Sequence, residues 1–192
     1  MIDRVAKWLR ESRRAVVLTG AGISTDSGIP DFRGPNGVWT KNPGAEKLSS
    51  LEHYMNDRSV RVLAWQTRTD HPAWGARPND AHVALADLQR AGAVGTIVTQ
   101  NIDGLHQMAG AKYVIEIHGT MRDVVCMSCG ERAPMQRALD RVRAGEEDPP
   151  CRTCGGILKS ATISFGQSLV AEDLQAAEMA AAGCTLFLSI GT

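Results

Sequence analysis

The sequence carries no surplus of charge of either sign, since 21 lysines and arginines balance 21 aspartates and glutamates. A net charge of zero offers no electrostatic reason to bind nucleic acid or an anionic membrane, so we expect neither as a partner. A long apolar run is also missing, because no stretch approaches the roughly 20 residues that a bilayer-spanning helix needs.

The first residues lack the uncharged apolar stretch of a signal peptide, because Asp3, Arg4 and Lys7 interrupt it. The apolar residues between them recur at helical spacing and predict an amphipathic helix over residues 2–13. A cytoplasmic location is therefore expected. Cysteine is scarce as well, with five in the whole chain. In a reducing compartment, thiols serve as metal ligands more readily than as disulfides.

The sequence does contain an alternation of apolar runs and helical patterns. This alternation predicts an α/β fold, a Rossmann-like parallel sheet with helices on both faces. Ligands of such sheets bind beyond the carboxyl ends of the strands. The expected strands cover 15–19, 94–99, 113–117 and 184–190. The expected helices cover 2–13, 80–91 and 171–182, with a short helix near 103–109 and a mixed helical stretch over 45–75.

The first expected strand runs directly into a glycine-rich loop. Gly20 and Gly22 allow a tight turn and let a pyrophosphate approach the backbone amides. The ordinary dinucleotide fingerprint has its third glycine where Thr25 stands, so this loop departs from it. A Pro-Asp-Phe-Arg block follows at 30–33. A charged pair around an aromatic ring suits a loop that handles a reacting cofactor, and a loop-fixing ion pair is the alternative.

Polar residues follow two further expected strands. His118 ends one of them, and a neutral imidazole can transfer protons near neutral pH, which makes it a candidate general base. A structural role is the alternative for a histidine at a strand end. Gln100, Asn101 and Asp103 follow the strand at 94–99. Turn formation and helix capping explain such short polar residues equally well.

Two C-x-x-C pairs stand in the second half of the chain, formed by Cys126 with Cys129 and by Cys151 with Cys154. Four thiolates suit tetrahedral Zn²⁺ and leave no open position, so the expected metal site is structural. A redox dithiol is the alternative. Cys184 stands alone in an apolar strand and reads as a buried, inert thiol.

Taken in order, the glycine loop, the Gln-Asn-Ile-Asp segment, the His-Gly pair and the two C-x-x-C pairs resemble the sirtuin family of NAD-dependent protein-lysine deacylases. The resemblance runs from about Val16 to Thr192. It implies NAD as co-substrate, one structural Zn²⁺ per chain and acylated lysine side chains of proteins as partners. It also implies a Rossmann-like NAD-binding domain over 1–119 and 161–192, a helical insert at about 40–78 and a zinc-binding module over 120–160. Sirtuins continue beyond a Gly-Thr pair such as the final one here, so we expect a chain truncated at its C-terminus.

The resemblance also implies roles for individual residues. It assigns His118 and Asn101 to catalysis, and the four paired cysteines to zinc. Asp103, with the backbone of Ile102, would hold the nicotinamide carboxamide, and Phe32 would shield the reactive ribose carbon. The full set of implied NAD contacts is Gly20, Ala21, Gly22, Ser24, Ile29, Asp31, Phe32, Arg33, Gln100, Asn101, Ile102, Asp103, Gly191 and Thr192. His106 would have a structural or supporting role.

Sirtuins bind the acyl-lysine peptide as an added strand, and the matching segment here is Ile163, Ser164, Phe165 and Gly166. One sirtuin branch removes succinyl and malonyl groups with a Tyr-x-x-Arg pair, whose counterpart here is Trp65 and Arg68. Arg68 would bind an acyl carboxylate, with packing as the alternative role of Trp65. The predicted function is NAD-dependent deacylation, with acetyl as the expected acyl group and release of nicotinamide and O-acyl-ADP-ribose. Mono-ADP-ribosyl transfer and non-catalytic binding of ADP-ribose or acyl-lysine are the alternatives.

Overall fold

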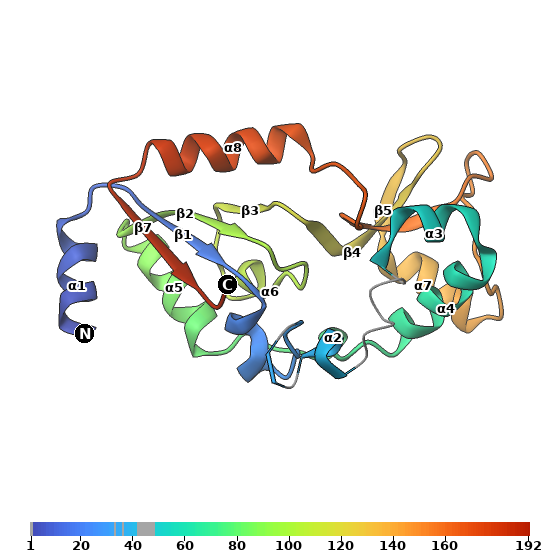
Figure 1. The fold of residues 1–192 in the computed structure, drawn as a ribbon, viewed down its shortest axis with the longest axis horizontal. Helices are drawn as coiled ribbons and strands as arrows, with labels where there is room; N and C mark the ends of the chain where they lie inside the picture. The colour runs from blue at the N-terminus through green and yellow to red at the C-terminus, as the bar shows by residue number, and fades with distance from the viewer. Residues whose placement is uncertain (1, 33, 36, 42–48) are drawn as a thin grey trace. The chain divides into compact units, whose positions relative to one another are not determined.

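A computed structural model describes residues 2–32, 34–35, 37–41 and 49–192 (Figure 1). The chain divides into two compact units. The first consists of Met1–Asp31, Ala76–His118 and Leu169–Thr192, and the second of Phe32–Gly75 and Gly119–Ser168. Among the helices of the described residues, none is both long enough and apolar enough to cross a membrane.

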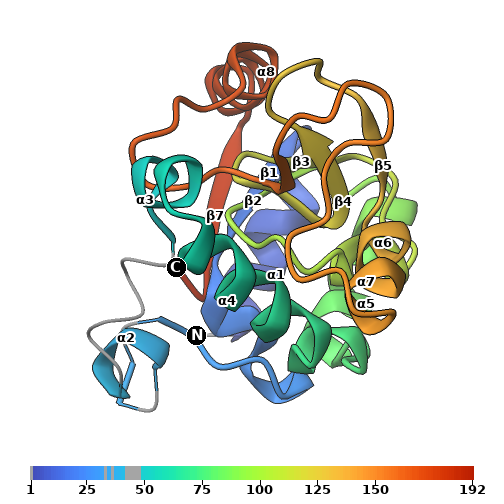
Figure 2. The ribbon, with the colours of Figure 1, turned by 90° about the vertical axis from the view of Figure 1, so that its right-hand side faces the viewer.

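The first unit is built on a four-stranded sheet in the order β3-β2-β1-β7. All three pairings are parallel. The strands are β1 (Ala15–Thr19), β2 (Val94–Thr99), β3 (Val114–Glu116) and β7 (Leu186–Ile190). The helices are α1 (Ile2–Glu11), α5 (Asp80–Arg90), α6 (Leu105–Met108) and α8 (Ala171–Ala182), and a 3₁₀-helix, η1, covers Ala21–Ser27. α5 and α8 lie on opposite faces of the sheet (Figures 1 and 2).

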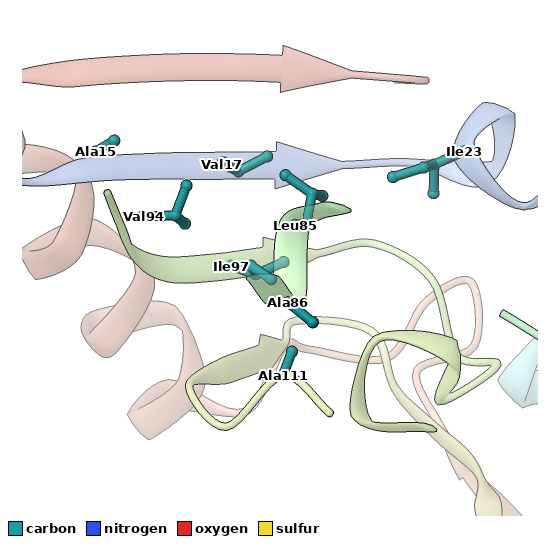
Figure 3. Packing of buried hydrophobic residues seen from close by; sticks show 8 residues of the cluster. All are labelled: Ala15, Val17, Ile23, Leu85, Ala86, Val94, Ile97 and Ala111. Carbon is teal, nitrogen blue, oxygen red and sulfur yellow. The ribbon is translucent and has the colours of Figure 1, made fainter. Parts of the chain in front are cut away.

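The core of this unit lies between the sheet and α5 (Figure 3). β-branched side chains from β1 and β2 meet Leu85 and Ala86 of α5, and all are almost fully buried. Burial of one such large aliphatic side chain contributes about 1.5–3 kcal/mol. The cluster consists of Ala15, Val17, Ile23, Leu85, Ala86, Val94, Ile97 and Ala111. The packing fixes α5 against the sheet, so the beginning of α5 has a defined position relative to η1.

The second unit contains an antiparallel sheet in the order β5-β4-β6. Its strands are β4 (Gly119–Cys126), β5 (Arg132–Pro134) and β6 (Leu158–Thr162). Its helices are α2 (Val38–Lys41), α3 (Leu51–Asn56), α4 (Arg58–Thr69), η3 (Pro72–Trp74) and α7 (Met135–Arg143). Trp65 of α4 is fully buried in one hydrophobic cluster with Met135 and Leu139 of α7.

The predicted parallel sheet with flanking helices is confirmed. The strands expected at 15–19 and 94–99 and the helix expected at 171–182 have the predicted limits. The largest differences are at the first helix, which stops at Glu11, at the short helix α6, which begins at Leu105, and at the last strand, which begins at Leu186. The ends of β3 and α5 differ from the expected ones by one residue. The helical insert and the cysteine-bearing segment fall within the same compact unit. The predicted limits of the zinc module at 120 and 160 stay a prediction.

Candidate active site

The glycine loop after β1 is held by the last residues of the chain. The N–H of Gly20 donates to the Ile190 carbonyl at 3.1 Å, and the N–H of Gly22 donates to the Gly191 carbonyl at 2.8 Å. A Cβ atom on Gly20 would lie 2.7 Å from the Gly191 carbonyl oxygen, and one on Gly22 would lie 2.9 Å from the Gly191 Cα. These glycines are therefore required for backbone contact within the protein.

The sequence predicted that Ala21 and Gly22 contact phosphate and ribose through backbone atoms. The N–H of Gly22 is engaged by Gly191, and the Gly22 carbonyl accepts from the Thr25 hydroxyl at 2.9 Å. Gly191 therefore takes both the N–H of Gly22 and the space where its Cβ would stand, and the predicted cofactor contact of Gly22 stays a prediction. The predicted contacts of Ala21 and Ile29 stay predictions. Arg33 lies outside the described residues, so its predicted contact with NAD stays a prediction, and the alternative ion pair with Asp31 is left open.

Three of the predicted residues meet in a buried hydrogen-bond network at the carboxyl ends of β1 and β2. The Ser24 hydroxyl donates to Asp103 Oδ2 at 2.8 Å. The Asn101 Nδ2 donates to Ser24 Oγ and to the Gly20 carbonyl, both at 3.1 Å. Ser24, Asn101 and Asp103 are each buried. The Leu105 N–H donates to Asp103 Oδ1 at 2.9 Å, so Asp103 also forms a turn just before α6, whose N-cap residue is Gly104.

The orientation of His118 is set by a backbone contact. Its Nδ1 lies 3.0 Å from the carbonyl oxygen of Gln100. A carbonyl oxygen only accepts hydrogen bonds, so Nδ1 carries the proton and Nε2 keeps the lone pair in the neutral ring. The side chain is half-buried, and the residue lies in the turn that follows β3. An imidazole held in this tautomer presents Nε2 as a proton acceptor, which is the property required of a general base.

Two further histidines are buried behind this network. His106 Nε2 lies 2.9 Å from the Thr19 hydroxyl, which itself donates to Thr99 Oγ1 at 2.8 Å. Burial, together with the neighbouring His82, lowers the pKa of His106 to about 4, while Asp103 opposes the shift. His106 is therefore neutral at pH 7. The His82 ring lies 4.9 Å from the His106 ring, centroid to centroid.

The sequence did not single out His82, which was expected to be a surface or packing residue. It is fully buried, and its Nε2 lies 3.4 Å from Ser24 Oγ. Burial lowers its pKa, and Asp103 opposes that effect. A usable signal was present in the sequence, because Asn79 and His82 have the spacing of a helix capping box.

The four predicted metal ligands come together in the second unit. The Sγ atoms of Cys126, Cys129, Cys151 and Cys154 all lie within 4.8 Å of one another. The Cys126–Cys154 and Cys129–Cys151 separations are 3.5 and 3.8 Å. A disulfide needs about 2.05 Å, whereas Zn–S bonds of about 2.3 Å in a tetrahedron give sulfur separations of about 3.8 Å. The cluster therefore fits one structural Zn²⁺.

The turn that follows Cys126 favours the thiolate form of this cysteine. The Ser128 N–H donates to Cys126 Sγ at 3.4 Å. The Cys129 backbone N–H, opposed by burial, lowers the pKa of Cys126 to about 6. A Cβ on Gly156 would lie 2.4 Å from Ser128 Oγ and 3.0 Å from Cys126 Sγ. A glycine is therefore needed where the two C-x-x-C turns approach each other.

The predicted acyl-peptide segment is partly paired within the chain. The Phe165 N–H donates to the Ser49 carbonyl at 2.8 Å, and the Leu51 N–H donates to the Phe165 carbonyl at 3.0 Å. The Ser164 N–H donates to Gln167 Oε1 at 3.2 Å, and the Gln167 N–H donates back to the Ser164 carbonyl at 2.9 Å. The backbone groups of 164 and 165 are therefore engaged, and their role in peptide binding stays a prediction.

Trp65 and Arg68 lie together on α4. The Arg68 guanidinium carbon is 5.6 Å from the Trp65 ring centroid and 5.8 Å from the Tyr54 ring centroid. Burial lowers the pKa of Arg68, with Tyr54 opposing the shift. Among the described residues, neither Trp65 Nε1 nor Arg68 Nη1 has a hydrogen-bond partner, although both atoms are buried. The full burial of Trp65 is what its packing role requires.

A model of the Sir2 family matches residues 20–192. Among curated relatives, the NAD-dependent protein deacetylase 2 of Streptomyces coelicolor is 52% identical over 178 residues, which is 92% of this chain and 74% of that protein. The NAD-dependent protein deacetylase of Thermodesulfovibrio yellowstonii is 39% identical, over 100% of this chain and 74% of that protein.

Solved structures of Sir2 proteins are similar along the whole chain. One with a deacetylated p53 peptide and 3′-O-acetyl ADP ribose has a TM-score of 0.90 at 33% identity, covering 100% of this chain and 76% of that one. Another, with a p53 peptide and NAD⁺, has a TM-score of 0.88 at 32% identity, with the same coverage. The similarity therefore includes sequence as well as fold.

Proposed function

Because the chain belongs to the Sir2 family, we propose that the residues gathered around Ser24, Asn101 and His118 carry out NAD-dependent deacylation of protein lysines. The protein is an NAD-dependent protein-lysine deacylase, as its relatives are. The orientation of His118 is the observation that carries the residue assignment. Its Nδ1 proton faces the Gln100 carbonyl, which leaves Nε2 free of that proton. The cytoplasmic location is part of the proposal and is supported by four cysteines that are suited to metal rather than to disulfides.

The residues around the strand ends fit NAD. The polar side chains of Ser24, Asn101 and Asp103 gather beside the glycine loop at the carboxyl ends of β1 and β2, which is where parallel sheets bind their ligands. NAD supplies a ribose carbon that becomes reactive toward the acyl oxygen when nicotinamide leaves. The Asp103 carboxylate, aligned by the Ser24 hydroxyl and the Leu105 N–H, would hold the carboxamide. Asn101 would orient the ribose and water, and His118 Nε2 would accept a ribose hydroxyl proton.

The test is incubation of the protein with NAD and a panel of acyl-lysine peptides. Nicotinamide release, loss of the acyl mass from the peptide and appearance of O-acyl-ADP-ribose are expected together. Transfer of ADP-ribose to protein, without loss of the acyl group, would replace the proposal by mono-ADP-ribosyl transfer. Release of no nicotinamide, with binding of ADP-ribose or acyl peptide retained, would indicate a binding module.

We propose acetyl as the preferred acyl group. The relatives named deacetylases support it, and Sir2 structures bound to acetylated and propionylated peptides are similar to this chain. The Tyr54 hydroxyl donates to the Leu158 carbonyl at 2.8 Å, so this nearby phenol is already engaged. Indole has one N–H donor and no hydroxyl, so Trp65 and Arg68 offer a carboxylate less than a Tyr-x-x-Arg pair does.

A specific observation favours removal of acidic acyl groups as a second activity. Trp65 Nε1 and Arg68 Nη1 are buried donors without a partner among the described residues. Buried unpaired donors are costly, and an incoming carboxylate would satisfy them.

Comparison of acetyl- and succinyl-lysine peptides decides between the two preferences. We expect a higher kcat/KM for acetyl, and we expect Trp65→Tyr to shift the ratio toward succinyl by about tenfold, the worth of one added hydrogen bond to a charged group. Arg68→Met is the matched control, because it should remove any succinyl turnover and spare acetyl turnover. A wild-type preference for succinyl would contradict the acetyl proposal and show that Trp65 and Arg68 suffice.

A further inference from the structure

The beginning of α5 reaches η1 through two residues of its capping box. Asn79 accepts the N–H groups of Ala81 and His82 with its Oδ1, at 3.0 and 3.3 Å. The other end of the same amide faces the cofactor loop, because Asn79 Nδ2 donates to the Ile23 carbonyl at 2.8 Å. His82, one turn along, is fully buried and lies 3.4 Å from Ser24. The helix cap and the loop are therefore joined by two neighbouring side chains.

The donors and acceptors around Ser24 fix the direction of the His82 contact. The Ser24 hydroxyl gives its only proton to Asp103 and accepts one from the Asn101 amide. A hydroxyl has two acceptor positions, so the remaining one accepts from His82 Nε2–H. The other ring nitrogen, Nδ1, then accepts from the Asn79 N–H, which lies 3.3 Å away. Nδ1 also lies 3.0 Å from Asn79 Oδ1, so the contacts with Asn79 alone do not decide which ring nitrogen carries the proton. The Ser24 contact decides it, because the Ser24 hydroxyl proton is already given to Asp103.

A directed chain of hydrogen bonds results, from the Asn79 backbone through His82 and Ser24 to the Asp103 carboxylate. Its starting point is rigid, because Leu85 and Ala86 pack α5 into the core against β1 and β2. Its end point is the carboxylate that the proposed function places against the nicotinamide carboxamide. Without the His82 donor, Ser24 would be held by Asn101 and Asp103 alone, and the direction of its hydroxyl toward Asp103 would be less constrained.

We propose that His82 is a positioning residue of the deacylation reaction, which aligns the Asp103 carboxylate through Ser24 while Asn79 holds η1 by the Ile23 carbonyl. This inference rests on the proposed function, because it assigns a reaction role to a residue that touches no reacting atom. A purely structural reading competes with it, in which Asn79 and His82 do no more than cap α5. The two readings predict different results for substitutions that separate the cap from the loop contact.

Substitutions at His82 and at Asn79 can separate the helix cap from the contact with η1. The Gln amide nitrogen reaches the position of a histidine Nε2, so His82→Gln keeps a donor to Ser24 but lacks the acceptor at Nδ1. The Asn amide oxygen takes the position of Nδ1, so His82→Asn keeps the cap acceptor but does not reach Ser24. In the same way, Asn79→Asp keeps the cap oxygen, because aspartate is as good an N-cap as asparagine. It loses the donor to Ile23, because a carboxylate has no N–H.

The experiment measures the KM for NAD, kcat and amide hydrogen exchange over residues 21–28 in the three variants. His82→Asn is expected to raise the KM for NAD about three- to tenfold, the worth of one hydrogen bond, and to speed exchange over 21–28. His82→Gln is expected to stay near wild type in both. Asn79→Asp is expected to speed exchange with an unchanged helix cap, seen as an unchanged melting temperature.

The proposal is overturned if His82→Asn matches wild type while His82→Gln is impaired, because only the cap would then matter. Equal loss in both His82 variants, with a matching fall in melting temperature, also overturns it. The exchange measurement needs no turnover. A protein that releases no nicotinamide would therefore refute the proposed function, while the exchange comparison would still decide whether His82 and Asn79 hold η1.

Discussion

Replacement of His118 by alanine is expected to lower deacylation by about a hundredfold or more, the usual scale for loss of a general base. The structure supplies the physical reason for this size. The contact of Nδ1 with the Gln100 carbonyl keeps the ring in one tautomer and directs the lone pair of Nε2 outward. Alanine removes the acceptor and leaves no group in its place. The measurement is the rate of acyl-group loss from an acyl-lysine peptide at saturating NAD.

Nicotinamide exchange provides the internal comparison for this variant. Cleavage of the glycosidic bond precedes the proton abstraction, so exchange should fall much less than deacylation. His53→Ala is the matched control, because His53 is an exposed histidine of α3 and should be replaceable without effect. Near-wild-type deacylation by the His118→Ala protein would remove His118 from the mechanism and leave it a structural histidine.

The strands of the first unit could be predicted from the sequence because their signal is local. Residues 15–18 are apolar, as is typical of a strand buried on both faces, and Gly20 follows directly after the strand. The 3₁₀-helix at Ala21–Ser27 could not be predicted in this way. Its first turn is positioned by the Gly22–Gly191 hydrogen bond, whose partners are far apart in the sequence. Contacts of that range are invisible to periodicity.

In the candidate site, too, residues with a local sequence motif could be predicted, and residues defined by distant contacts could not. Asn101, Asp103 and His118 could be nominated from motifs at strand ends, because parallel strands bring their carboxyl ends to one edge of the sheet. His82 was missed because its contact partner, Ser24, lies 58 positions away. The sequence leaves the role of Trp65 open between packing and substrate binding. The structure adds that Trp65 Nε1 and Arg68 Nη1 are buried donors without a partner among the described residues, and substitution of either residue tests whether they bind substrate.

The second large effect concerns the metal. One Zn²⁺ per chain is expected, bound by Cys126, Cys129, Cys151 and Cys154, whose sulfur atoms already lie at tetrahedral spacing. The three-stranded sheet of the second unit is small, and Cys126 and Cys151 belong to the same buried cluster as Trp65. Structural zinc contributes apparent binding energies of about 10–16 kcal/mol in zinc-finger peptides. A whole domain is stable by only about 5–15 kcal/mol, so loss of the metal should unfold this unit.

Cys151→Ser is therefore expected to abolish stoichiometric zinc, lower the melting temperature and remove deacylation indirectly, although no cysteine of the cluster is assigned to the reaction. Zinc content by metal analysis, followed during chelator treatment of the wild-type protein, measures the effect. Cys184→Ser is the matched control, because Cys184 lies outside the cluster and its replacement should leave zinc content and activity unchanged. Thiolates must be deprotonated to bind, so the metal should also be released as the pH falls. Carefully prepared protein that contains no zinc and carries a disulfide among the four cysteines would refute the structural zinc site.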